Sequence, residues 1–156
     1  MISFFNNENK LIMNKNRSSC PLVNILDIIG DKWSLVIIRD IFVGKKSYGE
    51  FLASHENIST SVLASRLQLL EKAGLIKHRL SISDKKVKLY YLTDKGIDLY
   101  PILYEMFNWS KRNLDKEFFP VAEQWFKRYK SVNSIEAIKD NQKKYKKVRA
   151  ELLELE

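Results

Sequence analysis

The stretch "NISTSVLASRLQLLEKAGLI", residues 57–76, constrains the fold most, because it predicts a helix whose two sides differ sharply. Leu63, Leu67 and Leu70 follow the i, i+4, i+7 spacing that places side chains in one stripe. Gly74 lies just beyond them and can end the helix. A helix of about four turns is expected, with the leucine stripe facing a core. The opposite side then carries Ser61, Ser65, Gln68 and Lys72, with Ala64 at its edge.

This outer side is unusual for an exposed helix in a lysine-rich chain. Exposed helices favour Glu, Lys and Arg, and each serine in their place costs roughly a few tenths of a kcal/mol. Small neutral side chains with donors and acceptors suit a helix that lies against a second surface and reads its hydrogen-bonding edges, and the DNA major groove is such a surface. The alternative is a polar helix surface without a partner.

Charge and cysteine content limit the setting of the chain. The 156 residues suffice for one domain with a core, and a net charge of +8 favours an anionic partner such as nucleic acid, a membrane surface or an acidic protein. No apolar run approaches the ~18 residues that span a bilayer, and residues 1–15 lack the apolar core and cleavage site of a signal peptide. The single cysteine, Cys20, cannot close an internal disulfide. We therefore expect a cytoplasmic protein that does not enter a membrane.

Helix-start and helix-stop signals divide the first half of the chain. Pro21 begins "PLVNILDIIG", and Asp31 caps "DKWSLVIIRDIFVG"; each segment ends in glycine. Ser47 and Glu50 form an S-x-x-E capping box that opens a short helix, "SYGEFLASHE". A turn at Asn57 and a cap at residue 59 then lead into the amphipathic helix.

After residue 74 the pattern changes from helical to extended. "LIKHRLSI" and "KVKLYYLT" are β-rich and partly alternating, with "SDKK" between them, which predicts a hairpin. Thr93 then caps a helix through "DKGIDLYPILYEMFNWSKRNL", which Pro101 must kink or restart. The order of elements predicts a mainly α fold with a small β-hairpin wing, a winged helix-turn-helix. In that arrangement the amphipathic helix enters the major groove and the wing reaches the backbone or minor groove.

The predicted DNA contacts form two groups, in a region of residues 57–96 that holds eight basic and three acidic side chains. The base-reading group on the amphipathic helix is Thr60, Ser61, Ala64, Ser65 and Gln68. The group for phosphate and wing contacts is Ser47, Tyr48, Arg66, Lys72, Arg79, Lys85, Lys86 and Lys88. Other roles stay open for part of the second group: capping for Ser47, an ion pair for Arg66, and an ordinary solvated turn for residues 85–88.

Three blocks of the sequence resemble the HxlR-type winged-helix transcriptional regulators, relatives of the MarR group. They are "CPLVNILDIIGDKWSLVIIRDI", "ISTSVLASRLQLLEKAGLIKHRL", and "YYLTDKGIDLYPIL" with the tryptophan that follows at position 109. The resemblance implies a homodimeric bacterial or archaeal DNA-binding protein, and in some members the cysteine before the proline senses electrophiles or oxidants. Cys20 occupies that position. The tail beyond residue 114 is longer than the family requires.

Two roles are open for Cys20. It precedes a helix-starting proline, where the helix dipole favours the reactive thiolate, and this gives a redox sensor a mechanism. Free cysteines are, however, commonly buried and inert, and the chain has no second cysteine to resolve an intramolecular disulfide. His55 and His78 have no partner at metal-ligand spacing, so neither a metal site nor a cofactor is predicted.

Apolar segments after residue 96 exceed what a small monomer buries. "IDLYPILYEMFNW" is apolar almost all round, and "FFPVAEQWF" extends the same surface. A homodimer interface explains both if aromatic residues interlock with the partner's N-terminal segment. The predicted interface residues are Phe4, Phe5, Tyr104, Phe107, Phe118 and Phe119. Residues 134–156, with six basic and five acidic side chains at helical spacing, are expected to form an exposed helix or a frayed tail.

These features predict three parts: an N-terminal arm over 1–19 that contributes dimer contacts, a DNA-binding domain over 20–113, and a helical extension over 114–156 that dimerises or stays exposed. The predicted function is sequence-specific regulation of transcription on double-stranded DNA, as a domain-interlocked homodimer on a (pseudo)palindromic operator, with an inducer of unknown identity, a small molecule or oxidant. The absence of Gly-rich phosphate loops, H-E-x-x-H and G-x-S-x-G motifs argues against an enzyme. The alternative is a winged helix that binds RNA or another protein without reading DNA sequence.

Overall fold

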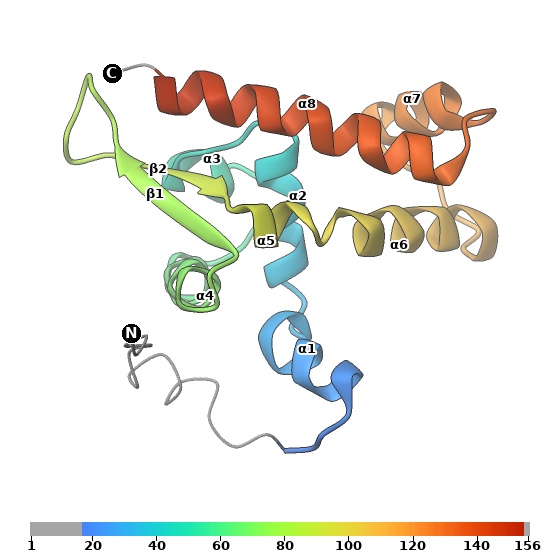
Figure 1. The fold of residues 1–156 in the computed structure, drawn as a ribbon, viewed down its shortest axis with the longest axis horizontal. Helices are drawn as coiled ribbons and strands as arrows, with labels where there is room; N and C mark the ends of the chain where they lie inside the picture. The colour runs from blue at the N-terminus through green and yellow to red at the C-terminus, as the bar shows by residue number, and fades with distance from the viewer. Residues whose placement is uncertain (1–16, 155–156) are drawn as a thin grey trace, which may run out of the picture. The chain divides into compact units, whose positions relative to one another are not determined.

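The computed structural model describes residues 17–154 and divides the chain into two compact units, one up to Gly96 and one from Ile97 (Figure 1). The first unit holds α1 (Pro21–Ile29), α2 (Ser34–Phe42), α3 (Tyr48–Leu52), α4 (Thr60–Lys72), β1 (Ile76–Leu80) and β2 (Lys88–Leu92). At the boundary lies α5 (Asp94–Ile97), and the second unit holds α6 (Tyr100–Asn113), α7 (Pro120–Tyr129) and α8 (Ser134–Glu154). The element order and the single described hairpin confirm the predicted fold class.

The start of α2 shows how a cap works at a short distance from its helix. Pro21 lies in the first turn of α1, as predicted, and Gly30 is the C-cap of that helix. Asp31 caps less directly than the sequence suggested, because α2 begins only at Ser34. Asp31 Oδ1 accepts hydrogen bonds from the amides of Trp33 (2.8 Å) and Ser34 (3.0 Å). The first hydrogen bond closes the turn before α2, and the second gives a partner to the amide of the first residue of the helix.

The leucine stripe of α4 lies in the core of the first unit. Leu63, Leu67 and Leu70 are at most 2% exposed, and Phe51 of α3 and Ile38 of α2 are equally buried. Burial of a leucine stabilises a fold by roughly 1.5–3 kcal/mol relative to an exposed position. The stripe therefore fixes which side of α4 faces outwards.

The chain turns tightly from α4 into the hairpin. β1 pairs antiparallel with β2, from Ile76 opposite Leu92 to Leu80 opposite Lys88. Gly74 has a φ of 72°, a left-handed conformation that favours glycine, and it ends α4 as predicted. A glycine is required at position 96 for a different reason: a Cβ there would lie 2.1 Å from the Leu75 carbonyl oxygen. The hairpin and α5 are thus held close to the end of α4.

The long helix expected after Thr93 is two helices. The amide of Gly96 donates to Thr93 Oγ1 at 3.2 Å, so the predicted cap exists, but α5 ends at Ile97. The next helix, α6, starts at Tyr100 with Pro101 in its first turn. The restart at the proline was one of the two predicted outcomes.

Aromatic side chains fill the second unit. The ring of Trp125 on α7 lies 5.5 Å from that of Tyr104, 5.6 Å from Phe107 and 5.3 Å from Tyr129. A further ring contact joins Phe118 to Phe126, the residue after Trp125, with ring centroids 5.9 Å apart. Edge-to-face contacts of this kind add to the stability that burial alone provides. The cluster joins α6 to α7.

The last helix, α8, packs against α6 within the second unit. Ala137 and Tyr145 are its buried residues, and Gln142 Nε2 donates to the Ile97 carbonyl at 3.1 Å. Residues 134–154 are therefore helical, as expected. Within residues 17–154, no helix combines the length and the apolar character that crossing a bilayer requires. The division at Gly96 falls inside the predicted domain over 20–113, whose outer boundaries stay a prediction.

Candidate nucleic-acid interface

One side of α4 is open to solvent along the whole helix. The residues of this outer face of α4 are all exposed: Thr60, Ser61, Ala64, Ser65, Gln68 and Lys72. The leucine stripe lies on the opposite side, so the predicted orientation of the helix is confirmed. The structure brings the whole predicted base-reading group together on this face. The bases that these residues would contact stay a prediction.

The chemistry of this face suits close approach to a surface of donors and acceptors. Five of its six side chains are uncharged, and the hydroxyls lie on short stems. An α-helix fits the major groove, which is about 12 Å wide, and a glutamine such as Gln68 can form two hydrogen bonds with adenine. Ala64 is small enough for apolar contact with a thymine methyl group. A face of this kind can distinguish base pairs, whereas a charged face would mainly bind phosphates.

The short helix α3 positions the first turn of α4. The Tyr48 hydroxyl donates to the Thr60 carbonyl at 2.7 Å, and Asn57 takes a left-handed φ of 55° in the predicted turn. Ser59 caps α4, as predicted, because its Oγ accepts from the Val62 amide at 3.4 Å. Tyr48 was predicted as a phosphate contact. This hydrogen bond ties α3 to the first turn of α4, a structural role that the sequence did not reveal, and the phosphate contact stays a prediction.

The predicted capping box at the start of α3 is present. Glu50 Oε2 accepts from the amides of Lys46 (2.9 Å) and Ser47 (2.7 Å), and Ser47 Oγ accepts from the Glu50 amide. Partial burial raises the pKa of Glu50, but these hydrogen bonds outweigh it and hold the pKa below the ordinary 4.5. The capping role of Ser47 is therefore confirmed, and its phosphate contact stays a prediction. The helix itself ends at Leu52, earlier than expected.

The wing carries basic side chains at its tip. Lys85, Lys86 and Lys88 are exposed, and no acidic side chain of the described residues pairs with them. The tip is shaped by Asp84, whose Oδ1 accepts from the Lys86 amide at 2.9 Å. Arg79 is half-buried, and its Nε donates to the carbonyl of the next residue at 3.4 Å. The three lysines are thus free to meet an anionic partner.

The wing is attached to the segment that precedes α3. The Tyr90 amide donates to the Lys46 carbonyl at 2.7 Å, and Ser47 forms an antiparallel bridge with Leu89. α3 in turn contacts α4. The structure therefore places both predicted groups of DNA contacts in one unit, linked through residues 46 and 47.

Arg66 lies at the edge of α4 and turns towards α2. Its Nη1 is 3.6 Å from Asp31 Oδ2, and its Nε is buried without a hydrogen-bond partner in residues 17–154. Burial raises the pKa of Asp31, but hydrogen bonds from Ser34 and Trp33 outweigh it and lower the pKa below 3.8. The ion pair, one of the two roles open for Arg66, is present in the structure, and its phosphate contact stays a prediction.

A buried charged cluster, which the sequence did not indicate, connects α2 to the segments on either side of α3. Asp40 is 2% exposed, and its carboxylate accepts from Arg39 Nη2 (2.6 Å) and Lys45 Nζ (3.0 Å). The Ser54 hydroxyl donates to the same carboxylate. Arg39 Nη1 also donates to Glu56 at 2.7 Å, and this hydrogen bond lowers the pKa of Glu56 below 4.5. The cluster holds the turn that leads into α4.

Cys20 is exposed and is the N-cap residue of α1. Its amide donates to Ser18 Oγ at 3.0 Å, and its carbonyl accepts from the Asn24 amide at 3.1 Å. Because the residue is exposed and both hydrogen bonds involve its backbone, the buried alternative for Cys20 does not apply. His78 Nδ1 contacts Glu71, and no group of three or more His, Cys, Asp or Glu in the described part of the chain could hold a metal ion.

The predicted dimer residues are placed differently from one another. Phe4 and Phe5 lie outside the described residues, Tyr104 is buried, and Phe107 and Phe118 are half-buried in the aromatic contacts of their own unit. Phe119 is exposed.

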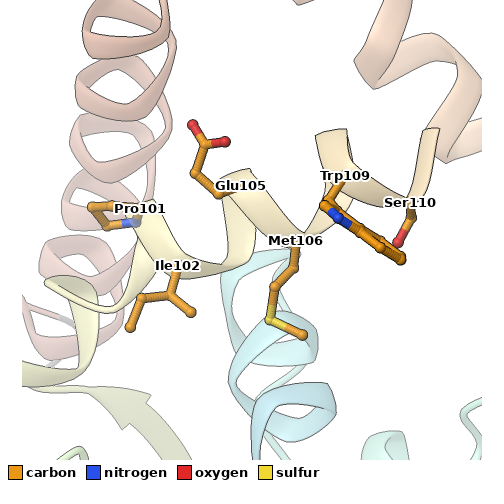
Figure 2. A pocket seen from close by; sticks show the side chains of 6 residues that line it. All are labelled: Pro101, Ile102, Glu105, Met106, Trp109 and Ser110. Atoms are coloured by element: carbon orange, nitrogen blue, oxygen red, sulfur yellow. The ribbon is translucent and has the colours of Figure 1, made fainter. Parts of the chain in front are cut away.

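The exposed apolar surface of α6 is formed by other residues. An open depression runs along one side of the helix, lined by Pro101, Ile102, Glu105, Met106, Trp109 and Ser110. Ile102 and Met106 project from the same side of α6, whereas Glu105 points away from them (Figure 2). Ile102, Met106 and Trp109 are 40–54% exposed. The sequence indicated this segment as an interface but not these three side chains.

Comparisons with known proteins agree with this geometry. The HxlR-like helix-turn-helix family model matches residues 28–118. The uncharacterized HTH-type transcriptional regulator YvaP of Bacillus subtilis is 33% identical over 107 residues, which are 68% of this chain and 98% of YvaP. The uncharacterized HTH-type transcriptional regulator sll1512 of Synechocystis is 30% identical over 98 residues, 63% of this chain and 73% of that protein. The oxidized redox regulator HypR is structurally similar, with a TM-score of 0.56, 32% identity, and coverage of 62% of this chain and 100% of HypR.

Proposed function

Because the chain belongs to the HxlR-like helix-turn-helix family of transcriptional regulators, we propose that it binds double-stranded DNA sequence-specifically, with the outer face of α4 in the major groove. The observation that carries the proposal is the chemistry of that face: six exposed residues, five of them uncharged, in a protein of net charge +8. Base edges in the major groove present a different pattern of donors and acceptors for each base pair. Hydroxyl and amide side chains match such a pattern.

The wing supplies contacts to the DNA backbone in this proposal. Lys85, Lys86 and Lys88 are unpaired at the tip of the hairpin, and Lys72 lies at the end of α4. Phosphate contacts position a protein on the duplex without carrying sequence information. Specificity would therefore come from α4 and much of the affinity from the wing.

The proposed regulator acts as a homodimer. Ile102, Met106 and Trp109 leave an apolar surface on α6 that a monomer exposes to water, and such surfaces commonly mark association sites. A two-fold dimer requires a (pseudo)palindromic operator with half-sites about 34–36 Å apart, or multiples of that distance. Sedimentation of the full chain tests the oligomeric state. A monomer at the concentrations that bind DNA would contradict this part of the proposal.

We propose Cys20 as a sensor of oxidants or electrophiles. The accessible thiol supports this role, and so does the similarity to HypR, a redox regulator. With one cysteine in the chain, the thiolate would add to an external electrophile, or would form a disulfide with an external thiol or the cysteine of a partner chain while an oxidant such as diamide takes up the two electrons and two protons. Cys20→Ser should leave DNA affinity unchanged and remove its response to diamide. A response that persists in Cys20→Ser would exclude this role.

The proposal involves no catalytic step, and a regulator of this kind acts in the cytoplasm, where the DNA is. The competing function is RNA or protein binding by the same fold. Selection of a duplex from a random pool, followed by affinity measurements, separates the two. A sequence-specific reader should bind the selected duplex about 10³–10⁷-fold more tightly than random DNA, with an affinity that falls steeply as salt rises. A ratio near one would favour the competing function.

A further inference from the structure

A second basic surface lies on α8, the long C-terminal helix in Figure 1, outside the residues that match the family. Its four lysines follow i, i+4, i+7, i+8 spacing and share one side of the helix. All four are exposed: Lys139, Lys143, Lys146 and Lys147. We call them the lysine face of α8. No acidic side chain in the described part of the chain pairs with any of them.

The other sides of α8 are engaged within its own unit. Ala137 and Tyr145 are buried, which fixes the rotation of the helix about its axis. Lys144 lies away from the lysine face and pairs with Asp140 at 2.5 Å, and its Nζ donates to the Tyr129 hydroxyl at 3.1 Å. The unit therefore neutralises a lysine that points towards its own residues and leaves the four outward lysines unneutralised.

Positive charge is concentrated in this part of the unit. Residues 139–149 contain six basic side chains and one acidic one, whereas the rest of residues 97–156 contains six basic and nine acidic side chains. A solvated helix commonly carries both signs, with opposite charges four residues apart. Lys139, Lys143 and Lys147 place like charges at that spacing, which destabilises a helix, and Lys147 alone of the four lysines has an acidic residue, Glu151, four positions away. An anionic partner would offset this repulsion.

We propose that the lysine face of α8 binds the phosphate backbone of double-stranded DNA, as a sequence-independent contact in addition to that of the winged helix. The inference rests on the proposed function, because the same duplex would be bound by both units. The four lysines span about 12 Å of helix, and their long side chains can reach several phosphates of a duplex that carries one charge per about 1.7 Å.

A membrane surface is the other extended anionic partner, and the composition of α8 disfavours it. Helices that bind membranes place large apolar side chains beside their basic residues. The other exposed residues in line with the four lysines are Glu136, Ala150 and Glu154. The large exposed apolar side chains of α8 are not interleaved with these lysines: Ile135 and Leu153 lie beyond the two ends of the lysine face, and Val148 lies on the other side of the helix. The buried positions of α8, Ala137 and Tyr145, are used inside the unit. DNA is therefore the partner that the lysine face fits.

The test is a full-length variant with all four lysines of this face changed to glutamine. Its affinity for the selected duplex and for a random duplex should fall by the same factor, about ten-fold or more at moderate salt, because each lost phosphate contact removes its counterion release. The slope of log affinity against log salt should become less steep by about 2–4. The ratio between the two duplexes should stay unchanged. Circular dichroism checks that the variant is folded.

A matched control removes the same charge from the same unit. In this control variant, four other exposed basic residues of the unit are changed to glutamine: Arg112, Lys116, Lys127 and Lys130. The control should change the salt slope by less than half as much as the lysine-face variant. An equal change in both variants would show that only net charge matters, and would overturn the inference.

Two further outcomes separate the inference from the proposed function. If the wild type prefers its selected duplex but the lysine-face variant keeps the full salt slope, the inference fails and the proposed function stands. If the wild type shows no duplex preference, the proposed function fails. The lysine face would be reassigned to membranes if the wild type bound phosphatidylserine-containing vesicles and the variant did not, while both proteins had the same DNA salt slope.

Discussion

The outer face of α4 and the lysine face of α8 are both exposed helix surfaces, yet their chemistry is opposite. The α4 face has one lysine among six residues, and its other residues are short and neutral, whereas the α8 face is defined by four unpaired lysines. Base contacts distinguish sequences, and phosphate contacts strengthen binding to all of them. The two faces therefore call for different measurements. Substitutions on α4 should be judged by the ratio of affinities for different duplexes, and substitutions on α8 by how steeply affinity falls with salt.

Each outer face depends on how firmly the inner face is packed. α4 buries three leucines at 0–2% exposure, whereas α8 buries one alanine and one tyrosine. Replacement of a buried leucine removes apolar contacts and leaves a cavity. The comparison therefore begins with a test of the inner face of α4.

The largest expected effect is that of Leu67→Ala. The free energy of unfolding should fall by about 2–5 kcal/mol, because the side chain is 2% exposed in the core of its unit. Urea denaturation measures the change. Ser65→Ala, two residues away on the outer face, should change stability by no more than about 0.5 kcal/mol. Similar losses for both variants would mean that the two sides of α4 are not distinct.

Gln68→Ala should act on specificity rather than on stability. Loss of a bidentate contact should reduce discrimination by about 1–3 kcal/mol at one base position of the operator and leave binding to random DNA nearly unchanged. Affinities for operators with single base-pair changes measure this effect. A uniform loss across all of these duplexes would assign Gln68 to the backbone.

Lys86→Ala should have the opposite signature, because the lysine is unpaired at the wing tip. Affinity should fall alike for all sequences, and the salt slope should become less steep by about 1. The same set of duplexes, titrated at several salt concentrations, provides the measurement. A changed base preference would show that the wing reads sequence.

The smallest expected effect concerns the turn that supports α4. Arg39 holds the pKa of Glu56 below 4.5, so the pair contributes stability above pH 4.5 and loses it as pH falls through the lowered pKa of the folded state. Glu56→Gln should lower the free energy of unfolding by about 1 kcal/mol or less at neutral pH, and its difference from the wild type should shrink in acid. Urea denaturation at several pH values tests this. A difference that stays constant with pH would exclude ionisation of Glu56 as its cause.

The sequence predicted features that depend on neighbours within a few residues. The capping box of Ser47 and Glu50, the cap at Ser59 and the leucine stripe all follow from local spacing, and the structure contains each of them. The same holds for the hairpin, where the periodicity changes from helical to extended. Spacing also gave the outer face of α4, because the position of the stripe determines which residues are opposite.

Contacts between distant segments were not predictable in this way. The Asp40 carboxylate gathers partners from positions 39, 45 and 54, and no local pattern shows that these approach one another. Tyr104 and Phe107 illustrate the same limit for apolar residues. Their pattern indicated burial, but it could not show that Trp125 of the same chain is a contact of both.

The central claim is that the outer face of α4 lies against the duplex. In a Cys20→Ser background, which removes the only cysteine, Ser65→Cys places one thiol on this face and Gln124→Cys places one on the exposed side of α7. The measurement is the alkylation rate of each thiol with and without saturating selected duplex. We predict that the duplex protects the thiol at position 65 and leaves that at position 124 as reactive as before. Alkylation at position 65 that is equally fast with and without the bound duplex would contradict the claim.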